Sequence, residues 1–182
     1  MTRDDLARAI TERAYLQGTF VLRSGAVSNE YFDKYLFESD PTLLHAIAEA
    51  LAPLVDPGID YLAGLELGGV PLAVALGQVT GLPTLFVRKK AKEYGTRRLA
   101  EGGSIEGKRL LVVEDVVTSG GQVVLSTRDL RAAGAIVDSA ICVIDREAGG
   151  PEALASEGVT LRPLFRMSAL KRSGEAAGSE RG

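Results

Sequence analysis

The segment RLLVVEDVVTSGGQ, residues 109–122, is the most informative part of the sequence for the fold. It predicts an apolar strand over 109–113, then two acidic residues, a Thr-Ser-Gly-Gly turn and a helix over 121–133. An uninterrupted apolar strand is typical of a parallel sheet that is covered on both faces. In open α/β sheets, ligands bind at the carboxyl ends of the strands. The segment therefore indicates an α/β protein with a ligand site in this turn.

Strands and helices alternate along most of the chain. Strands are expected at 61–65, 84–88 and 136–145, and helices at 2–16, 70–80 and from Pro41 onward. A hairpin is expected within 19–37. The alternation predicts a mostly parallel central sheet flanked by helices, in a single domain.

Composition limits the classes of function. The 182 residues carry 21 Lys and Arg against 24 Asp and Glu, a net charge of −3, which disfavours a protein that coats nucleic acid. A single cysteine, Cys142, excludes an internal disulfide and a zinc site built on several cysteines. His45 is the one histidine, so histidine catalysis is not expected. The absence of a long apolar run and the charged N-terminus lead us to expect a cytoplasmic protein with neither nucleic acid nor membrane as a partner.

The residue types in the turn indicate a phosphorylated sugar as ligand. Glycines let the backbone approach a ligand, and free N–H groups at a helix start attract phosphate. Glu114 and Asp115 would repel a phosphate alone, but they suit vicinal sugar hydroxyls or a metal held through water. The alternative is a plain strand-to-helix turn whose acids favour the helix dipole.

This turn resembles the phosphoribosyl diphosphate signature of the type I phosphoribosyltransferases. The resemblance implies the fold of that family and a contact with phosphoribosyl diphosphate along the whole segment. In this chain the segment comprises Glu114, Asp115, Val116, Val117, Thr118, Ser119, Gly120, Gly121 and Gln122. The acids would meet the ribose hydroxyls, with Asp115 among the catalytic residues, and the turn would hold the 5-phosphate. A glycine-containing loop after the strand at 61–65 resembles the diphosphate loop of the family, which implies a backbone contact at Gly68.

Four cations in five positions follow the strand at 84–88, namely Arg88, Lys89, Lys90 and Lys92. Such density is usual for a solvated charged face, and a nucleic-acid patch is a second alternative. The pattern also resembles the loop entry of the orotate-using branch of the family. That resemblance implies a mobile loop over 89–107. In it Arg88, Lys89 and Lys92 are catalytic, contacting the diphosphate partly across a homodimer interface. The branch often has a histidine where this chain has Tyr94.

The residues 20–33 and 145–146 complete the resemblance to that branch. On their own, aromatic side chains in a hairpin are usually part of a core. The resemblance implies instead a small N-terminal hood, largely from 18–38, that covers a pyrimidine. The implied orotate contacts are Thr118, Arg146, Arg23, Tyr31 and Phe32, with Arg146 on the carboxylate.

The expected reaction transfers the phosphoribosyl group from phosphoribosyl diphosphate to orotate, which gives orotidine 5′-phosphate and diphosphate. The resemblance implies Mg²⁺ held mainly by ligand oxygens and not directly by the protein. We expect one domain over 1–170 and a flexible tail over 171–182. A purine phosphoribosyltransferase and a non-catalytic RNA-binding regulator of the same fold remain as alternatives.

Overall fold

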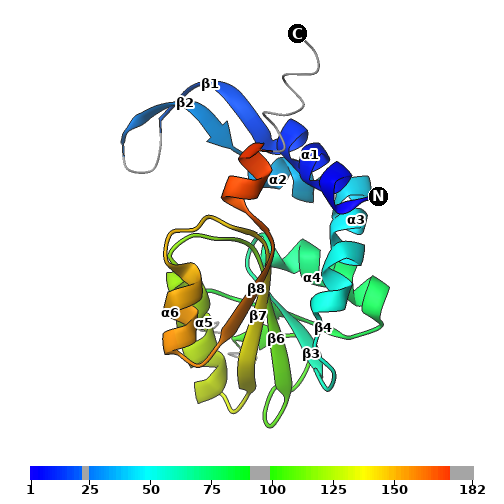
Figure 1. The fold of residues 1–182 in the computed structure, drawn as a ribbon. Coiled ribbons are helices and arrows are strands. Elements are labelled where there is room, and N and C mark those ends of the chain that lie inside the picture. The colour runs from blue at the N-terminus through cyan, green and yellow to red at the C-terminus, as the bar shows by residue number, and fades with distance from the viewer. Residues whose placement is uncertain (22–24, 91–98, 173–182) are drawn as a thin grey trace.

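The computed structural model describes residues 1–21, 25–90 and 99–172. Its centre is a six-stranded sheet with the strand order β5-β4-β3-β6-β7-β8 (Figure 1). The strands are β3 (Tyr61–Leu65), β4 (Thr84–Val87), β5 (Ala100–Glu101), β6 (Arg109–Val117), β7 (Ile136–Asp145) and β8 (Thr160–Arg166). All neighbours run parallel except β4 and β5. The predicted mostly parallel α/β sheet is confirmed.

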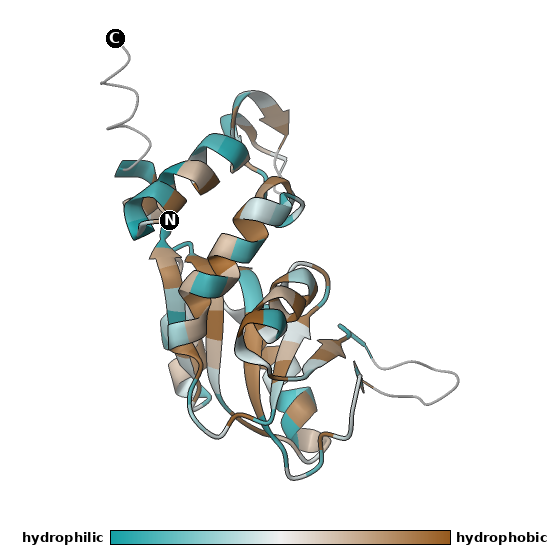
Figure 2. Cartoon of the chain, turned by 90° about the vertical axis from the view of Figure 1, so that its right-hand side faces the viewer, coloured by the Kyte–Doolittle hydropathy of each residue, from teal (hydrophilic) through white to brown (hydrophobic). Residues whose placement is uncertain are grey.

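Helices cover both faces of the sheet. On one face lie α3 (Pro41–Leu51), followed by the short η1 (Ala52–Leu54), and α4 (Gly69–Thr80); on the other lie α5 (Gly121–Ala132) and α6 (Gly150–Ser156). Alternate residues of β6 enter the two cores, since Leu111 packs with Ile47 and Leu72, whereas Val112 packs with Leu130. The apolar strands between polar-faced helices are visible in Figure 2. Burial on both faces explains why this strand reads as a continuous apolar run.

A small N-terminal unit lies beyond the carboxyl edge of the sheet. It consists of α1 (Arg3–Ala14), the antiparallel strands β1 (Tyr15–Val21) and β2 (Val27–Phe32), and α2 (Lys34–Glu38). Thr2 and Asp5 form a capping box that starts α1, and Asp40 caps α3 in front of Pro41. Figure 1 shows this hood over the sheet, with the helical residues 167–172 beside it.

Several element boundaries differ from the prediction. The strand expected to end at 113 continues as β6 through Glu114 and Asp115 to Val117, paired along its length with β7. The acids therefore belong to a buried strand and not to the turn. The prediction of helix through residue 16 is wrong as well, because β1 already begins at Tyr15.

Five elements were not predicted, namely α2, η1, β5, α6 and β8. Pro163 interrupts the β8 pattern, but it is tolerated because β8 is the last strand of the sheet and need not donate on its outer side.

Part of the segment expected as a mobile loop over 89–107 belongs to regular structure. Ala100 and Glu101 form β5 against β4, and the N–H of Gly107 donates to the carbonyl of Gly134. Residues 99–107 therefore pack on the domain, while 91–98 lie outside the described residues. Of the tail expected over 171–182, residues 171–172 are helical, and 173–182 lie outside the described residues.

Candidate active site

Four loops meet at the carboxyl edge of the sheet. They follow β3 (66–68), β4 (88–90), β6 (118–120) and β7 (146–149). From β3 the chain continues to β4 and β5 on one side of the sheet. It then returns to β6, on the other side of β3, and continues through β7 to β8, so the direction of strand order reverses between β3 and β6. Such a reversal leaves a crevice at the strand ends, which is the usual ligand site of open α/β sheets. The site predicted after β6 lies at this crevice.

The turn between β6 and α5 has the form of an anion cradle. Thr118 and Ser119 are exposed, and Gly120 has a φ of 77°. A Cβ on Gly120 would collide with Leu154 of α6, so only glycine fits there. No side chain caps the N-terminus of α5. Its first N–H groups and the positive end of its dipole therefore remain available to a phosphate.

The acidic residues of β6 form a buried cluster with two residues of α2. The Asp115 side chain is 1% exposed, and its Oδ2 atom lies 2.5 Å from Nζ of Lys34. Glu38 is 7% exposed, and a side chain at Gly68 would contact both Glu38 and Asp115. The sequence analysis missed Lys34 and Glu38, although a lysine four positions before a glutamate within YFDKYLFE is a visible signal of one charged helix face.

At neutral pH, two carboxyl groups of this cluster stay protonated, unlike carboxyl groups in water. Burial and the neighbouring Asp115 raise the pKa of Glu38 to about 9. Burial, followed by the Asp115 charge, also raises the pKa of Glu114 well above its usual range. Burial alone would raise the pKa of Asp115, but hydrogen bonds from Glu114 and Glu38 and the Lys34 ammonium outweigh it, so that the pKa of Asp115 is lowered. Asp115 is thus the charged member, next to two protonated acids.

This arrangement predicts a pH-dependent stability. Between its unfolded pKa of 4.5 and about 9, Glu38 is protonated in the folded state only, so stability falls as the pH rises through this window. Glu38→Gln retains a donor but does not titrate. We expect wild type to lose at least about 2 kcal/mol relative to Glu38→Gln between pH 5 and pH 9. Urea unfolding at pH 5, 7 and 9 measures this difference.

Glu152→Gln, at an exposed carboxylate on α6, is the matched control and should leave the pH profile of wild type unchanged. Parallel profiles for wild type and Glu38→Gln would contradict a protonated Glu38.

The loop after β3 touches both the acidic cluster and the loop after β4. Gly68 lies against the Asp115 carboxylate, and Gly69 lies against the carbonyl of Val113, so neither position has room for a side chain. Oε1 of Glu66 accepts a hydrogen bond from the N–H of Lys89 at 2.6 Å. The Glu66–Leu67 peptide bond is cis, and Leu67 is exposed. The predicted ligand contact of Gly68 is therefore placed beside the acids of β6.

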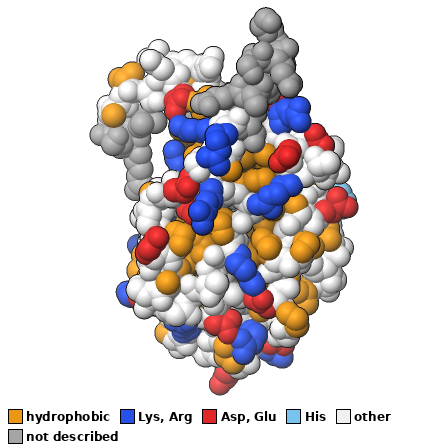
Figure 3. All heavy atoms as spheres, viewed as in Figure 1, with side chains coloured by type: hydrophobic (Ala, Val, Ile, Leu, Met, Phe, Trp, Pro, Cys, Tyr) orange, Lys and Arg blue, Asp and Glu red, His pale blue; other side chains and the backbone are white. Residues whose placement is uncertain are grey.

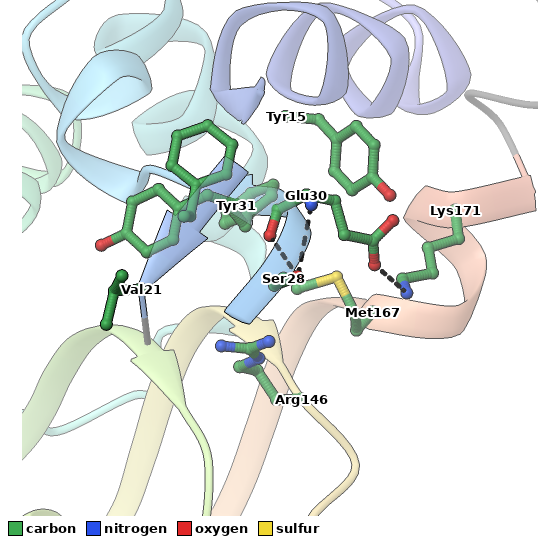
Figure 4. Close-up of a pocket in the computed structure, with 10 residues that line it drawn as sticks. Tyr15, Val21, Ser28, Glu30, Tyr31, Arg146, Met167 and Lys171 are labelled. Atoms are coloured by element: carbon green, nitrogen blue, oxygen red, sulfur yellow. Dashed lines mark hydrogen bonds and ion pairs between the residues drawn. The ribbon is translucent and has the colours of Figure 1, made fainter. Parts of the chain in front are cut away.

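A cavity of about 700 Å³ opens beneath the hood hairpin. Figure 4 shows Arg146 at its floor and Tyr31 on the hairpin above. The lining comprises Tyr15, Phe20, Val21, Ser28, Glu30, Tyr31, Phe32, Arg146, Met167 and Lys171. The rings of Phe20 and Tyr31 lie 5.4 Å apart, while Phe32 also packs on Phe37 of α2. The structure thus brings Tyr31, Phe32 and Arg146 together, and it adds Met167 and Lys171, which the sequence analysis missed because they lie far along the chain.

Of the three cations predicted to bind diphosphate, the structure describes Arg88 and Lys89. Nε of Arg88 lies 3.7 Å from Oε1 of Glu101 on β5, and Lys89 is exposed beside the β3 loop. Lys and Arg side chains gather below the hood on the face shown in Figure 3. Arg23, Lys92 and Tyr94 lie outside the described residues.

Over residues 1–21, 25–90 and 99–172, no group of three or more His, Cys, Asp or Glu side chains has the arrangement of a metal site. The same ranges contain no helix that is both long and apolar enough to span a membrane.

Comparisons with known proteins agree with this geometry. Residues 37–161 match the model of the phosphoribosyl transferase domain. The chain is 51% identical over 177 residues to the orotate phosphoribosyltransferase of Nocardioides sp., covering 97% of this chain and 99% of that one. The identity to the enzyme of that name from Pyrococcus furiosus is 42%, with 97% of each chain covered.

Solved structures give the same result. The orotate phosphoribosyltransferase of Mycobacterium tuberculosis superposes with a TM-score of 0.83 at 29% identity, covering 92% of this chain and 98% of that one. An adenine phosphoribosyltransferase from Thermoanaerobacter pseudethanolicus, at 20% identity and a TM-score of 0.67, shares the fold.

An α/β sheet with an uncapped glycine turn and two acids at its switch point is suited to a phosphorylated sugar ligand. The chain belongs to the phosphoribosyltransferase family, and it is therefore a glycosyltransferase. Within that family, the relatives that match it over nearly its full length are orotate phosphoribosyltransferases.

Proposed function

We propose that this protein transfers the 5-phosphoribosyl group of phosphoribosyl diphosphate to orotate, giving orotidine 5′-phosphate and diphosphate in pyrimidine biosynthesis. The observation that carries the proposal is the unpaired guanidinium of Arg146 in the hood cavity. Within the described ranges, the Arg146 side chain has no ion-pair partner, although its backbone N–H donates to the carbonyl of Val117. A planar cation on the floor of an aromatic-lined pocket suits a planar base with a carboxylate.

In this proposal, three regions of the site contact different parts of the substrates. The turn Thr118–Gln122 binds the 5-phosphate through backbone N–H groups and hydroxyls. Glu114 and Asp115 accept hydrogen bonds from the ribose hydroxyls, and the backbone at Gly68 approaches the diphosphate. Tyr31 and Phe32 cover the base, with Thr118 and Arg23 as further contacts. The protein brings the base and the sugar carbon together, and cations stabilise the charge that grows on the departing diphosphate.

Mg²⁺ fits this site chiefly as a partner of the substrate. The nearby carboxylate Asp115 already pairs with Lys34, and Glu38 and Glu114 hold protons, so the described residues offer few free oxygen ligands. Diphosphate and ribose oxygens would complete the hard-oxygen shell that Mg²⁺ prefers. When bound, the ion neutralises charge on the leaving group.

The direct test mixes the purified protein with phosphoribosyl diphosphate, Mg²⁺ and orotate and follows orotate absorbance. Loss of absorbance that stops on adding EDTA supports both the reaction and the metal. Consumption of adenine or hypoxanthine in place of orotate would overturn the assignment of the base in favour of a purine enzyme. Lack of turnover with every base, together with salt-sensitive RNA binding, would favour the regulator.

Lys92→Ala tests the role of the basic loop. We expect kcat to fall about a hundredfold or more, because removal of one preorganised charge from a leaving-group site typically costs that much. Lys90→Ala is the matched control, since Lys90 is a neighbouring cation at a position that the family pattern leaves open. Steady-state rates at saturating substrates check this, and equal small effects of both variants would contradict a catalytic Lys92.

The homodimer that shares this loop is part of the same proposal, as is a cytoplasmic location. A mixing experiment tests the sharing directly. If Lys92 acts on the partner's site, refolded mixtures of Lys92→Ala and Arg146→Ala should regain about a quarter of wild-type activity, because half of the symmetric dimers would contain one intact site. A mixture that stays as inactive as its components would show that each subunit uses its own loop.

A further inference from the structure

The helical residues 167–172 form a side wall of the base pocket. Met167, 9% exposed, and Lys171 line the cavity together with Arg146 (Figure 4). Nζ of Lys171 lies 3.3 Å from Oε1 of Glu30 on β2, as the dashed line in Figure 4 marks. The wall is therefore joined to the hood hairpin at one end of the cavity.

Near its first residues, the wall is hydrogen-bonded through Ser168 to Glu147, in the loop that carries Arg146. The Glu147 carboxylate accepts two hydrogen bonds from Ser168, one from its N–H at 2.8 Å and one from its hydroxyl at 3.0 Å. The N–H of Glu147 in turn donates to Oδ1 of the buried Asp145 at 2.9 Å. In the sequence, Arg146 thus lies between Asp145, the last residue of β7, and Glu147, which is hydrogen-bonded to the pocket wall.

The backbone at Glu147 is strained. Its φ is 57°, and among the described residues it is the one non-glycine residue with a positive φ. A left-handed backbone is unfavourable for a long side chain such as glutamate, and it persists only where surrounding contacts fix it. Glycine would adopt this conformation without strain, so a glutamate here indicates that its side chain is needed.

We propose that Glu147 is a positioning residue, which holds Arg146 and the wall formed by residues 167–171 at the spacing that fits a pyrimidine carboxylate. The inference rests on the proposed function and deepens it. Both hydrogen bonds of the Glu147 carboxylate go to Ser168, and in the described part of the chain none joins it to the turn at 118–122. The binding of orotate should therefore depend on Glu147, whereas the binding of phosphoribosyl diphosphate should not.

Glu147→Gly separates positioning from stability. Because relief of the strained φ offsets the loss of the two exposed hydrogen bonds to Ser168, the variant should unfold close to the temperature of wild type. Loss of these hydrogen bonds should nevertheless raise the KM for orotate about tenfold, with the KM for phosphoribosyl diphosphate within about twofold of wild type. A merely structural role would not weaken the base site alone in a protein of nearly unchanged stability.

Two companion variants sharpen the test. Ser168→Ala removes the hydroxyl donor and keeps the backbone donor, so it should raise the KM for orotate by a smaller factor, and the double variant should be no worse than Glu147→Gly alone. Glu157→Ala is the matched control, since Glu157 also receives two side-chain hydrogen bonds, from Arg128, at the α5 side of the domain. It should leave both KM values unchanged.

The outcomes distinguish this inference from the proposed function. Wild type that consumes orotate, with a Glu147→Gly variant of unchanged orotate KM, overturns the role of Glu147 alone. An equal rise of both KM values would mean that Glu147 supports the whole edge of the sheet and has no particular role at the base. Wild type that does not use orotate would overturn both proposals together.

Discussion

Arg146→Ala is expected to lower kcat/KM for orotate by at least about thirtyfold, since removing one partner of a charge pair that the bound base covers costs about 2–5 kcal/mol. The guanidinium faces an aromatic-lined cavity and, within the described residues, has no carboxylate to satisfy it. A ligand carboxylate would meet a preformed, bidentate partner there. Because the proposed site of the sugar phosphate is the β6–α5 turn, the KM for phosphoribosyl diphosphate should change less than about threefold. Initial rates with each substrate varied in turn measure both values.

Two further variants serve as comparisons for Arg146→Ala. Arg146→Lys retains the charge but loses the planar fork, so its kcat/KM should lie between those of wild type and Arg146→Ala. Arg128→Ala removes an exposed guanidinium from the surface of α5, where it pairs with Glu157, and should leave kinetics unaltered. An Arg146→Ala variant that weakens both substrates alike would contradict a specific contact with the base carboxylate.

The sheet and the glycine turn after β6 could be predicted from local sequence because their signals are local. A strand buried on both faces needs apolar residues at every position, and a tight turn beneath α6 needs glycine at 120. The end of β6 could not be predicted in this way. Glu114 and Asp115 read as the start of a turn, yet pairing with β7 and charge compensation by Lys34 keep them within the strand.

The base pocket shows the limit of local patterns more clearly. Tyr31, Phe32 and Arg146 were predicted from resemblance, and the structure places them around one cavity. Met167 and Lys171 were not predicted, because their contribution depends on where β8 returns the chain beneath the hood. Glu147 is similarly hidden, since a glutamate after Asp-Arg carries no signal until its φ and its bonds to Ser168 are known.

Lys34→Met is expected to destabilise the protein by about 2–3 kcal/mol, because it leaves a buried carboxylate without its counterion. The Asp115 side chain is 1% exposed and that of Lys34 33% exposed, with 2.5 Å between the charged atoms. A pair with one member so deeply buried should cost more when broken than a surface pair, for which the usual value is below about 1 kcal/mol. Urea unfolding at fixed protein concentration and neutral pH measures the free energy of unfolding.

Lys108→Met supplies the matched comparison. Nζ of Lys108 lies 3.3 Å from Oδ1 of Asp60, but these side chains are 45% and 37% exposed, so the same substitution should have little effect there. In the double variant Lys34→Met/Asp115→Asn the uncompensated charge is gone, and much of the stability should return. If Lys34→Met were no more harmful than Lys108→Met, Asp115 would have to be compensated by the protons on Glu38 and Glu114 alone. If the double variant recovered its stability but not its activity, the Asp115 charge would be required for the reaction and Lys34 for maintaining that charge in the folded protein.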